Sequence, residues 1–242
     1  MAPEHTVLHR SLFLRGPAGR LEAQLWTTGE AGARPFLRQR EHEEQKRAQQ
    51  ARLGGPLRGT MAALVCHPHP LYGGTLHNKV VFQAAKSFHR LGLPVLRFNF
   101  RGAGLSEGQH DRGRGELEDV RAALDFLAGE FPGRPVALAG FSFGAWVGLH
   151  VGAEDARVAR LVGLGIPVND SDFGYLRGCA KPKLFIAGTA DQFAARARVQ
   201  ALAESLPGPT ALVFVEGADH FFTGKLDQVD RAITEWMNSL GQ

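Results

Sequence analysis

Residues 135–149 read PVALAGFSFGAWVGL and place Ser142 between Gly140 and Gly144, after an apolar run and before a segment rich in small residues. The pattern Gly-x-Ser-x-Gly between a strand and a helix is typical of a sharp turn that holds the serine in strained backbone angles. Glycine on both sides lets the strand and the helix approach without a clash of Cβ atoms. The turn also leaves the backbone N–H of Phe143 free to donate to a negatively charged oxygen. We therefore predict that Ser142 is a nucleophile.

A serine hydroxyl is a poor nucleophile at neutral pH unless a base takes its proton and a carboxylate orients that base. In the architecture that contains such a turn, the acid and then the base follow the serine on loops after later strands. Residues 183–187 lead to Asp191, and residues 211–215 lead to His220. We predict Asp191 as the acid and His220 as the base. Asp219 is a rival acid, which we disfavour because adjacent loop side chains rarely face one another.

A second donor to the same oxygen is expected in the loop after the third strand. Residues 61–66 form an apolar run, and HPHPLYGG follows at 67–74. Proline has no N–H, so two positions of this loop are excluded as donors. The candidate backbone N–H groups belong to His69, Leu71 and Tyr72. We predict His69 as the donor and Tyr72 as a substrate contact.

A metal site at His67 and His69 is an alternative interpretation of this loop. It is disfavoured because no carboxylate or third histidine follows at a spacing typical of metal ligands. A second glycine-rich stretch, RGAGLS at 101–106, lacks the Walker lysine and the full glycine spacing of a dinucleotide site. We therefore expect neither a metal nor an organic cofactor, and we expect the 101–106 loop to support the rim of the site.

Apolar runs alternate with amphipathic segments along the chain. We expect extended segments at 6–14 and 20–27 joined by a turn at 16–19, and further strands near 61–66, 94–100, 135–139, 160–166, 182–187 and 211–215. Helices are expected near 78–91, 116–127, after Ser142, near 194–206 and near 225–240. Apolar strands without alternation are typical of a parallel sheet covered by helices on both faces. The sequence thus predicts an α/β protein with a mostly parallel, eight-stranded sheet and an antiparallel start.

Two segments lie outside this pattern. Residues 30–59 form an insert whose centre, RQREHEEQKRAQQAR at 38–52, has almost no apolar face and adds little to a core. We expect a tolerated surface insertion, with a partner-binding arm, a self-association element or a flap near the site as alternatives. Residues 167–180, which include the candidate substrate contact Phe173, are too few for a large cap domain. They predict a minimal cap and a shallow, open site.

The composition fits one globular domain, residues 1–242, with 44% hydrophobic and 21% charged residues. The formal net charge is +4, but the arginines are scattered and form no basic stripe with aromatic residues. We therefore expect no nucleic-acid partner. Cys66 and Cys179 form no recognisable metal or disulfide framework. Because we find neither a leader-like start nor a run as long as a membrane span, we expect a cytoplasmic location and no membrane partner.

Several stretches together carry a family resemblance. They are HPHPLYGGT at 67–75, HNKVV at 77–81, LRFNFRGAGLSEG at 96–108, GFSFGAW at 140–146, and HFF at 220–222 followed by Gly224 and Lys225. The chain resembles, over nearly its whole length apart from the insert, the small bacterial α/β-hydrolase-fold proteins related to dienelactone hydrolases and acyl-peptidase-like esterases. The sequence departs from that group in its acid loop, GTADQF at 188–193, which lacks a second acidic residue, and in Asp219, where asparagine is frequent.

This resemblance implies an α/β-hydrolase fold, a triad of Ser142, Asp191 and His220, and hydrolysis of an ester or related acyl bond. We accordingly expect a serine hydrolase that cleaves a small carboxylic ester through an acyl-enzyme on Ser142, with amides, thioesters and lactones as further substrate classes. The expected partner is the small-molecule ester or acyl substrate. The alternative is a non-catalytic protein of the same fold that binds a partner through the charged insert.

Overall fold

The computed structural model describes residues 7–28 and 60–240. These residues form one eight-stranded sheet in the order β1-β2-β4-β3-β5-β6-β7-β8. The strands are β1 (Val7–Gly16), β2 (Gly19–Thr28), β3 (Ala62–Cys66), β4 (Val95–Phe98), β5 (Val136–Phe141), β6 (Val158–Leu164), β7 (Lys183–Gly188) and β8 (Thr210–Val215). β1 pairs with β2 and β2 with β4 in antiparallel fashion, and the remaining neighbours are parallel. The mostly parallel sheet with an antiparallel start is as the sequence predicted.

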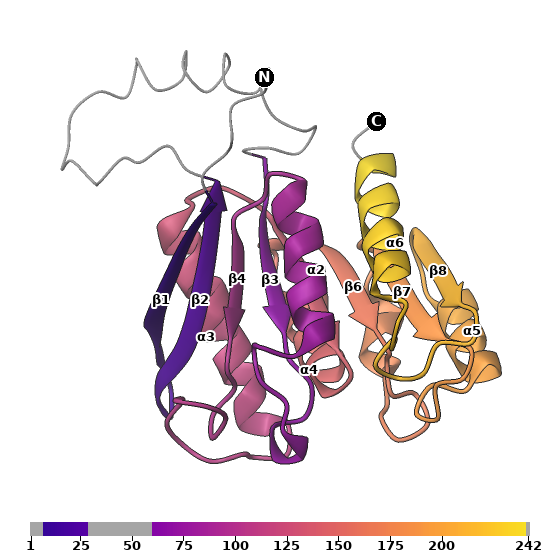
Figure 1. Cartoon of the computed structure of the whole chain (residues 1–242), viewed down its shortest axis with the longest axis horizontal. Helices are drawn as coiled ribbons and strands as arrows, with labels where there is room; N and C mark the ends of the chain where they lie inside the picture. Colours follow the sequence, from indigo (N-terminus) through magenta and orange to yellow (C-terminus); the bar gives the residue numbers. More distant parts are fainter. Residues whose placement is uncertain (1–6, 29–59, 241–242) are drawn as a thin grey trace, which may run out of the picture.

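Helices cover both faces of the sheet (Figure 1). They are α2 (Lys79–Arg90), α3 (Arg114–Glu130), α4 (Phe143–Glu154), α5 (Arg196–Ser205) and α6 (Leu226–Ser239), together with the short 3-10 helices η1 (Pro70–Tyr72) and η2 (Gly174–Gly178). α2 and α6 lie in front of the sheet in Figure 1, and α3 and α4 lie behind it. No helix in the described ranges is both long and apolar enough to cross a bilayer. The charged insert at 30–59 lies outside the described residues.

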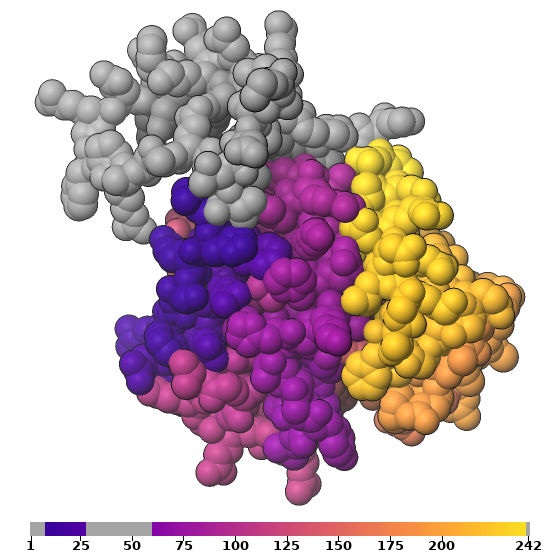
Figure 2. All heavy atoms as spheres, viewed as in Figure 1, coloured from indigo at the N-terminus to yellow at the C-terminus, as the bar shows by residue number. Residues whose placement is uncertain are grey.

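The apolar strands divide their side chains between two cores. Along β5, Val136 and Leu138 pack in the core that includes α3 and α4, whereas Ala137 and Ala139 pack in the core that includes α2 and α6. Every residue of β5 is buried. The atoms of α2 and α6 cover much of the front of the molecule in the space-filling view (Figure 2). Burial on both faces explains why the strands carry no alternation of polar and apolar residues.

Two element boundaries differ from the sequence-based expectation for a physical reason. β4 ends at Phe98 rather than near 100: the N–H of Asn99 still donates to the carbonyl of Glu22 on β2 at 2.7 Å, but the N–H of Phe100 turns away from the strands and donates to the His67 side chain at 2.9 Å. α3 begins at Arg114 rather than at 116, because the Glu116 carboxylate accepts the N–H of Gly113 at 2.8 Å and so caps the first turn. Both boundaries depend on hydrogen bonds that a pattern of apolar residues does not record.

His67 joins the ends of β3 and β4 at the edge where the site lies. Its Nδ1 donates to the carbonyl of Pro68 at 2.6 Å, and its Nε2 accepts the N–H of Phe100 at 2.9 Å. Both ring nitrogens thus have a partner. One donates and the other accepts, which is the pattern of a neutral imidazole. Complete burial lowers the pKa of His67 from 6.5 to about 3. His67 therefore holds the chain after β3 as a neutral, buried hydrogen-bonding group.

This arrangement predicts a specific loss of stability in acid. A histidine whose pKa is lowered by folding contributes fully above its unfolded pKa, about 6.5, and that contribution falls as the pH falls toward the folded value. Below pH 6.5, we expect His67 to lower the free energy of unfolding by about 1.4 kcal/mol for each further pH unit, because only the unfolded state then binds its proton. Urea denaturation of the wild type between pH 7.5 and 4.5 measures this slope.

Replacement of His67 isolates its share of the slope. The His67→Gln variant keeps an oxygen that can accept the Phe100 N–H, so it should be less stable at pH 7 but lose less stability in acid. His77→Gln, which changes an exposed histidine on the next loop, should retain the wild-type slope. Identical slopes for wild type and His67→Gln below pH 6.5 would contradict the assignment.

Candidate active site

The candidate residues gather at the carboxyl edge of the parallel strands, the lower edge in Figure 1. Ser142 follows β5, Asp191 lies three residues after β7, and His220 lies in the loop between β8 and α6. The loop that begins at His67 leaves the neighbouring strand β3 at the same edge. Parallel strands place these four loops side by side although the residues are far apart in the chain.

Ser142 stands at the turn between β5 and α4 in the strained conformation that the sequence predicted. Its φ is 55° and its ψ is −121°, outside the regions that residues with a side chain normally adopt. A Cβ on Gly140 would overlap the carbonyl oxygen of Gly144, and a Cβ on Gly144 would overlap that of His67. Only glycine allows β5, α4 and the end of β3 to come this close.

A hydrogen-bonded chain connects the Ser142 hydroxyl to a buried carboxylate. The Nε2 of His220 lies 3.0 Å from the Ser142 Oγ, and the Nδ1 lies 2.8 Å from the Oδ2 of Asp191. In the tautomer that fits both contacts, Nδ1–H donates to the carboxylate and Nε2 accepts the hydroxyl proton. The three residues that the sequence singled out are thus in mutual contact in the order acid, base, serine.

The surroundings hold the acid and the base in place. Asp191 is 7% exposed and His220 is 6% exposed. The second carboxylate oxygen of Asp191 accepts the N–H of Phe193 at 2.8 Å, so both oxygens have a partner. The His220 ring packs among the rings of Phe141, Phe193 and Phe221, with centroids 5.0, 4.7 and 5.4 Å away. A second acidic residue in the acid loop is not needed to orient Asp191.

Asp219 forms hydrogen bonds with the backbone of its own loop, whereas the Nδ1 of His220 contacts Asp191. Its Oδ1 accepts the N–H groups of Phe221 at 3.1 Å and Thr223 at 2.9 Å. The hydrogen bond from the Thr223 N–H lowers the pKa of the Asp219 carboxyl. Asp219 thus braces the loop that carries His220 from outside the hydrogen-bonded chain.

The geometry leaves one candidate donor on each side of Ser142. The N–H of Leu71 donates to the Nδ1 of His69 at 3.2 Å, and the N–H of Tyr72 donates to the carbonyl of His69 at 3.1 Å. Within the part of the chain that the structure describes, the N–H groups of His69 and Phe143 donate no hydrogen bond. The rings of these two residues are in contact, with centroids 4.8 Å apart. This distribution favours His69 and Phe143 as the pair of donors.

Several large apolar side chains are exposed on loops at the carboxyl edge of the strands. Leu71, Tyr72, Leu105 and Phe221 are all more than half exposed, and they lie on the loops after β3, β4 and β8. Tyr72 keeps its place as a candidate substrate contact. Phe173 does not: it is 2% exposed and packs in the core, so its ring offers no surface to a substrate.

An open hollow lies beside the base loop, between the starts of α2 and α6. Its volume is about 650 Å³, and its lining includes Thr75, Lys79, Phe221 and Leu226. The ring of Phe221, which lines the hollow, lies against that of His220, with centroids 5.4 Å apart. The hollow is of a size that accommodates a small organic molecule.

Sequence reasoning did not identify two buried polar residues that support the loop after β3. Arg97 on β4 donates to the carbonyl of Leu76 at 2.6 Å, and Asn99 accepts the Leu76 N–H at 2.7 Å. The Arg97 guanidinium also lies over the ring of Trp26, 4.3 Å from its centroid, and burial lowers the pKa of Arg97 to about 10. The signal available in the sequence was the presence of two polar residues inside the apolar run LRFNF at 96–100.

The alternative metal site at His67 and His69 is not supported by the contacts of the first residue. Both nitrogens of the His67 ring bind protein atoms, which leaves neither for a metal ion. Among the described residues, no three histidine, cysteine or acidic side chains are grouped as metal ligands would be. The chemistry available here is that of a hydroxyl, an imidazole and a carboxylate beside two free N–H groups.

The chain is similar in sequence and structure to known proteins. The family model of serine aminopeptidase, S33, matches residues 62–170. A Rickettsia prowazekii protein described as uncharacterized protein RP471 is 37% identical over 184 residues, which are 72% of this chain and 77% of that protein.

Two solved structures share both sequence and fold with the chain. An α/β serine hydrolase homologue from Coxiella burnetii is 33% identical, with a TM-score of 0.76 over 93% of this chain and 96% of the other. A Xanthomonas campestris protein described as an α/β serine hydrolase without a lid is 31% identical, with a TM-score of 0.78 over 98% and 96% of the two chains. Identity, coverage and the sheet with its serine turn agree, and the chain belongs to the α/β serine hydrolase family.

Proposed function

We propose that the protein cleaves a small carboxylic ester, or a related acyl bond, through an acyl-enzyme on Ser142. The observation that carries this proposal is the unbroken contact from Asp191 through His220 to the Ser142 hydroxyl, at 2.8 and 3.0 Å. In a protein of this fold that had lost its catalytic activity, we would expect one of these groups to be missing or the groups to lie apart. We also propose that the chain is one catalytic domain, with the single eight-stranded sheet as its support.

The contacts define the role of each group in the reaction. His220 accepts the hydroxyl proton as the Ser142 oxygen bonds to the carbonyl carbon, and the carbonyl oxygen becomes negatively charged. The N–H groups of Phe143 and His69 donate to that oxygen. The intermediate then expels the alcohol, which takes the proton from His220. A water molecule attacks the acyl-serine in the same way, and the acid leaves as the Ser142 hydroxyl is restored.

The open surroundings of the site support a small substrate. Between β6 and β7 the described chain contains only the short helix η2, so this connection contributes no cap domain over Ser142. The exposed side chains of Tyr72, against His69, and Phe221, against His220, offer apolar contact. These features favour an acyl or alcohol group that binds by shallow apolar contact.

A fluorophosphonate probe tests the nucleophile without a guess at the substrate. The probe reacts with activated serines, so we expect a single adduct in the intact mass of the wild-type protein and none in Ser142→Ala. Ser171→Ala, a substitution on the segment after β6, serves as the control and should react as the wild type does. A folded wild-type protein that takes no adduct would count against the mechanism.

The roles of the two neighbouring acids are distinguished by matched amide substitutions. Asp191→Asn removes the charge that orients His220, and it should lower kcat on an activated ester by a factor of about 10³ to 10⁴. Asp219→Asn keeps an oxygen that can accept the loop N–H groups, so its kcat should stay within about threefold of wild type. Steady-state kinetics on p-nitrophenyl acetate measures both. A larger loss in Asp219→Asn than in Asp191→Asn would reverse the assignment.

A further inference from the structure

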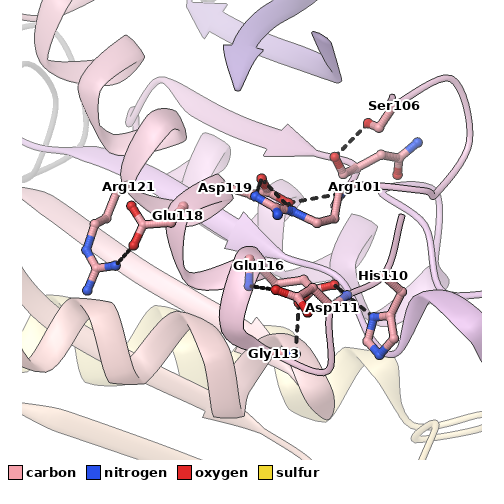
Figure 3. Close-up of polar contacts among 11 residues, drawn as sticks. Arg101, Ser106, His110, Asp111, Gly113, Glu116, Glu118, Asp119 and Arg121 are labelled. Carbon is pink, nitrogen blue, oxygen red and sulfur yellow. Dashed lines mark hydrogen bonds and ion pairs between the residues drawn. The ribbon is translucent and has the colours of Figure 1, made fainter. Parts of the chain in front are cut away.

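A second group of polar residues lies beside the loop after β3, outside the hydrogen-bonded chain. Figure 3 shows His110 next to Glu116, which belongs to the first turn of α3. The Glu116 side chain is fully buried and accepts the N–H groups of Asp111 and Gly113, each at 2.8 Å. The carboxylate thereby fixes the backbone that carries His110, and it lies in a place that water does not reach.

His110 contacts this carboxylate through its ring. The Nδ1 of His110 lies 2.8 Å from the Oε1 of Glu116, and the His110 side chain is only 9% exposed. The contact does not have the geometry of a hydrogen bond. The contact places the nitrogen edge of the ring toward Glu116. The opposite part of the ring is left for contact with other rings.

The His110 ring packs against the two residues whose N–H groups are free. Its centroid lies 4.7 Å from that of His69 and 5.5 Å from that of Phe143. His69 and Phe143 are themselves in contact at 4.8 Å, so the three rings form a closed triangle. We call these three side chains the ring triangle. Tyr72 lies on a further side of His69, with centroids 4.7 Å apart.

The ring triangle connects the two loops that supply the proposed donors. His69 belongs to the loop after β3, whereas Phe143 begins α4. No hydrogen bond between the backbones of these two residues is found among the described residues, and the ring contact links the two chains directly at this point. Donors act on an oxyanion only when they lie within a few tenths of an ångström of the required place. A ring that holds both residues is suited to this task.

We propose that His110 is a positioning residue for the oxyanion site: held by Glu116, its ring clamps His69 against Phe143 and so aligns their two N–H groups. This inference rests on the proposed function. His110 touches neither the substrate nor the reacting atoms and acts through the residues that donate. The turn before α3 also packs closely against α4, because a Cβ on Gly113 would overlap the ring of Trp146.

Comparison of an oxygen ester with its thionoester separates positioning from general stability. A thiocarbonyl sulfur is larger than oxygen and accepts hydrogen bonds weakly, so it gains little from aligned N–H donors. The ratio of kcat for p-nitrophenyl acetate to kcat for its thiono analogue therefore reports the alignment of the donors. Loss of one such donor lowers kcat about 10² to 10³-fold. Misalignment should cost less, and we expect His110→Ala to lower the ratio about tenfold with little change in KM.

Two further substitutions distinguish the role of the ring from that of its contact with Glu116. His110→Phe keeps a ring against His69 and Phe143 but leaves Glu116 without that partner. It should lower the melting temperature and preserve the ratio to within about threefold. His110→Gln keeps a polar group for Glu116 but removes the ring, so it should lower the ratio as His110→Ala does. If His110→Ala fails to fold, His110→Gln carries the test.

The control is His150→Ala. His150 lies on α4 and stacks on Tyr175 with centroids 4.4 Å apart, so it matches His110 as a ring in an aromatic contact outside the ring triangle. Its substitution should leave the ratio unchanged. An unchanged ratio in both His110→Ala and His110→Gln, or an equal loss in His110→Phe, would overturn the proposal.

Failure of the proposed function has a different signature. Wild-type protein that takes no fluorophosphonate adduct and hydrolyses neither ester would remove the catalytic mechanism, and the role of His110 with it. Wild-type protein that reacts at Ser142 while all His110 variants keep the wild-type ratio would remove only the positioning role.

Discussion

The contact among β5, α4 and the end of β3 is the constraint on which the site depends. Gly140 and Gly144 have no room for a Cβ, because carbonyl oxygens of the neighbouring turn and strand occupy that space. The contact places Ser142 at φ 55° and begins α4 directly after it. It also brings the loop that contains His69 beside the first N–H of that helix. One close approach of backbone to backbone therefore fixes Ser142 and brings together the loops of both candidate donors.

Buried polar groups give rigidity to the loops around this contact, which have little regular structure of their own. His67 links the chain after β3 to Phe100, Arg97 holds the carbonyl of Leu76, and Glu116 holds the turn before α3. A buried polar group without a partner costs roughly 1–3 kcal/mol. The loops therefore cannot shift without exposing or orphaning these groups. The loops are fixed by hydrogen bonds as the sheet is fixed by apolar packing.

Local patterns in the sequence were sufficient to predict the succession of strands and helices along the chain and the turn at Ser142. Each of these features depends on residues close together in the chain, as in residues 135–149. Asp191 and His220 also followed from local patterns, since each lies just after a strand. The supports could not be predicted in this way. His110 and His69 are far apart in the sequence and meet only through folding, and Phe173, expected to contact the substrate, is packed in the core.

The strain at Ser142 is tolerated because of where it lies in the sheet. A residue with a side chain at positive φ costs about 1–3 kcal/mol and persists only where the surroundings over-determine it. β5 is a central strand with every residue buried, and α4 packs the buried side chains of Ala145, Val147 and Leu149 behind it. A turn at the edge of the sheet would relax and lose its alignment with His220. The strained serine is therefore placed between a buried central strand and a buried helix face, where packing on both sides holds it.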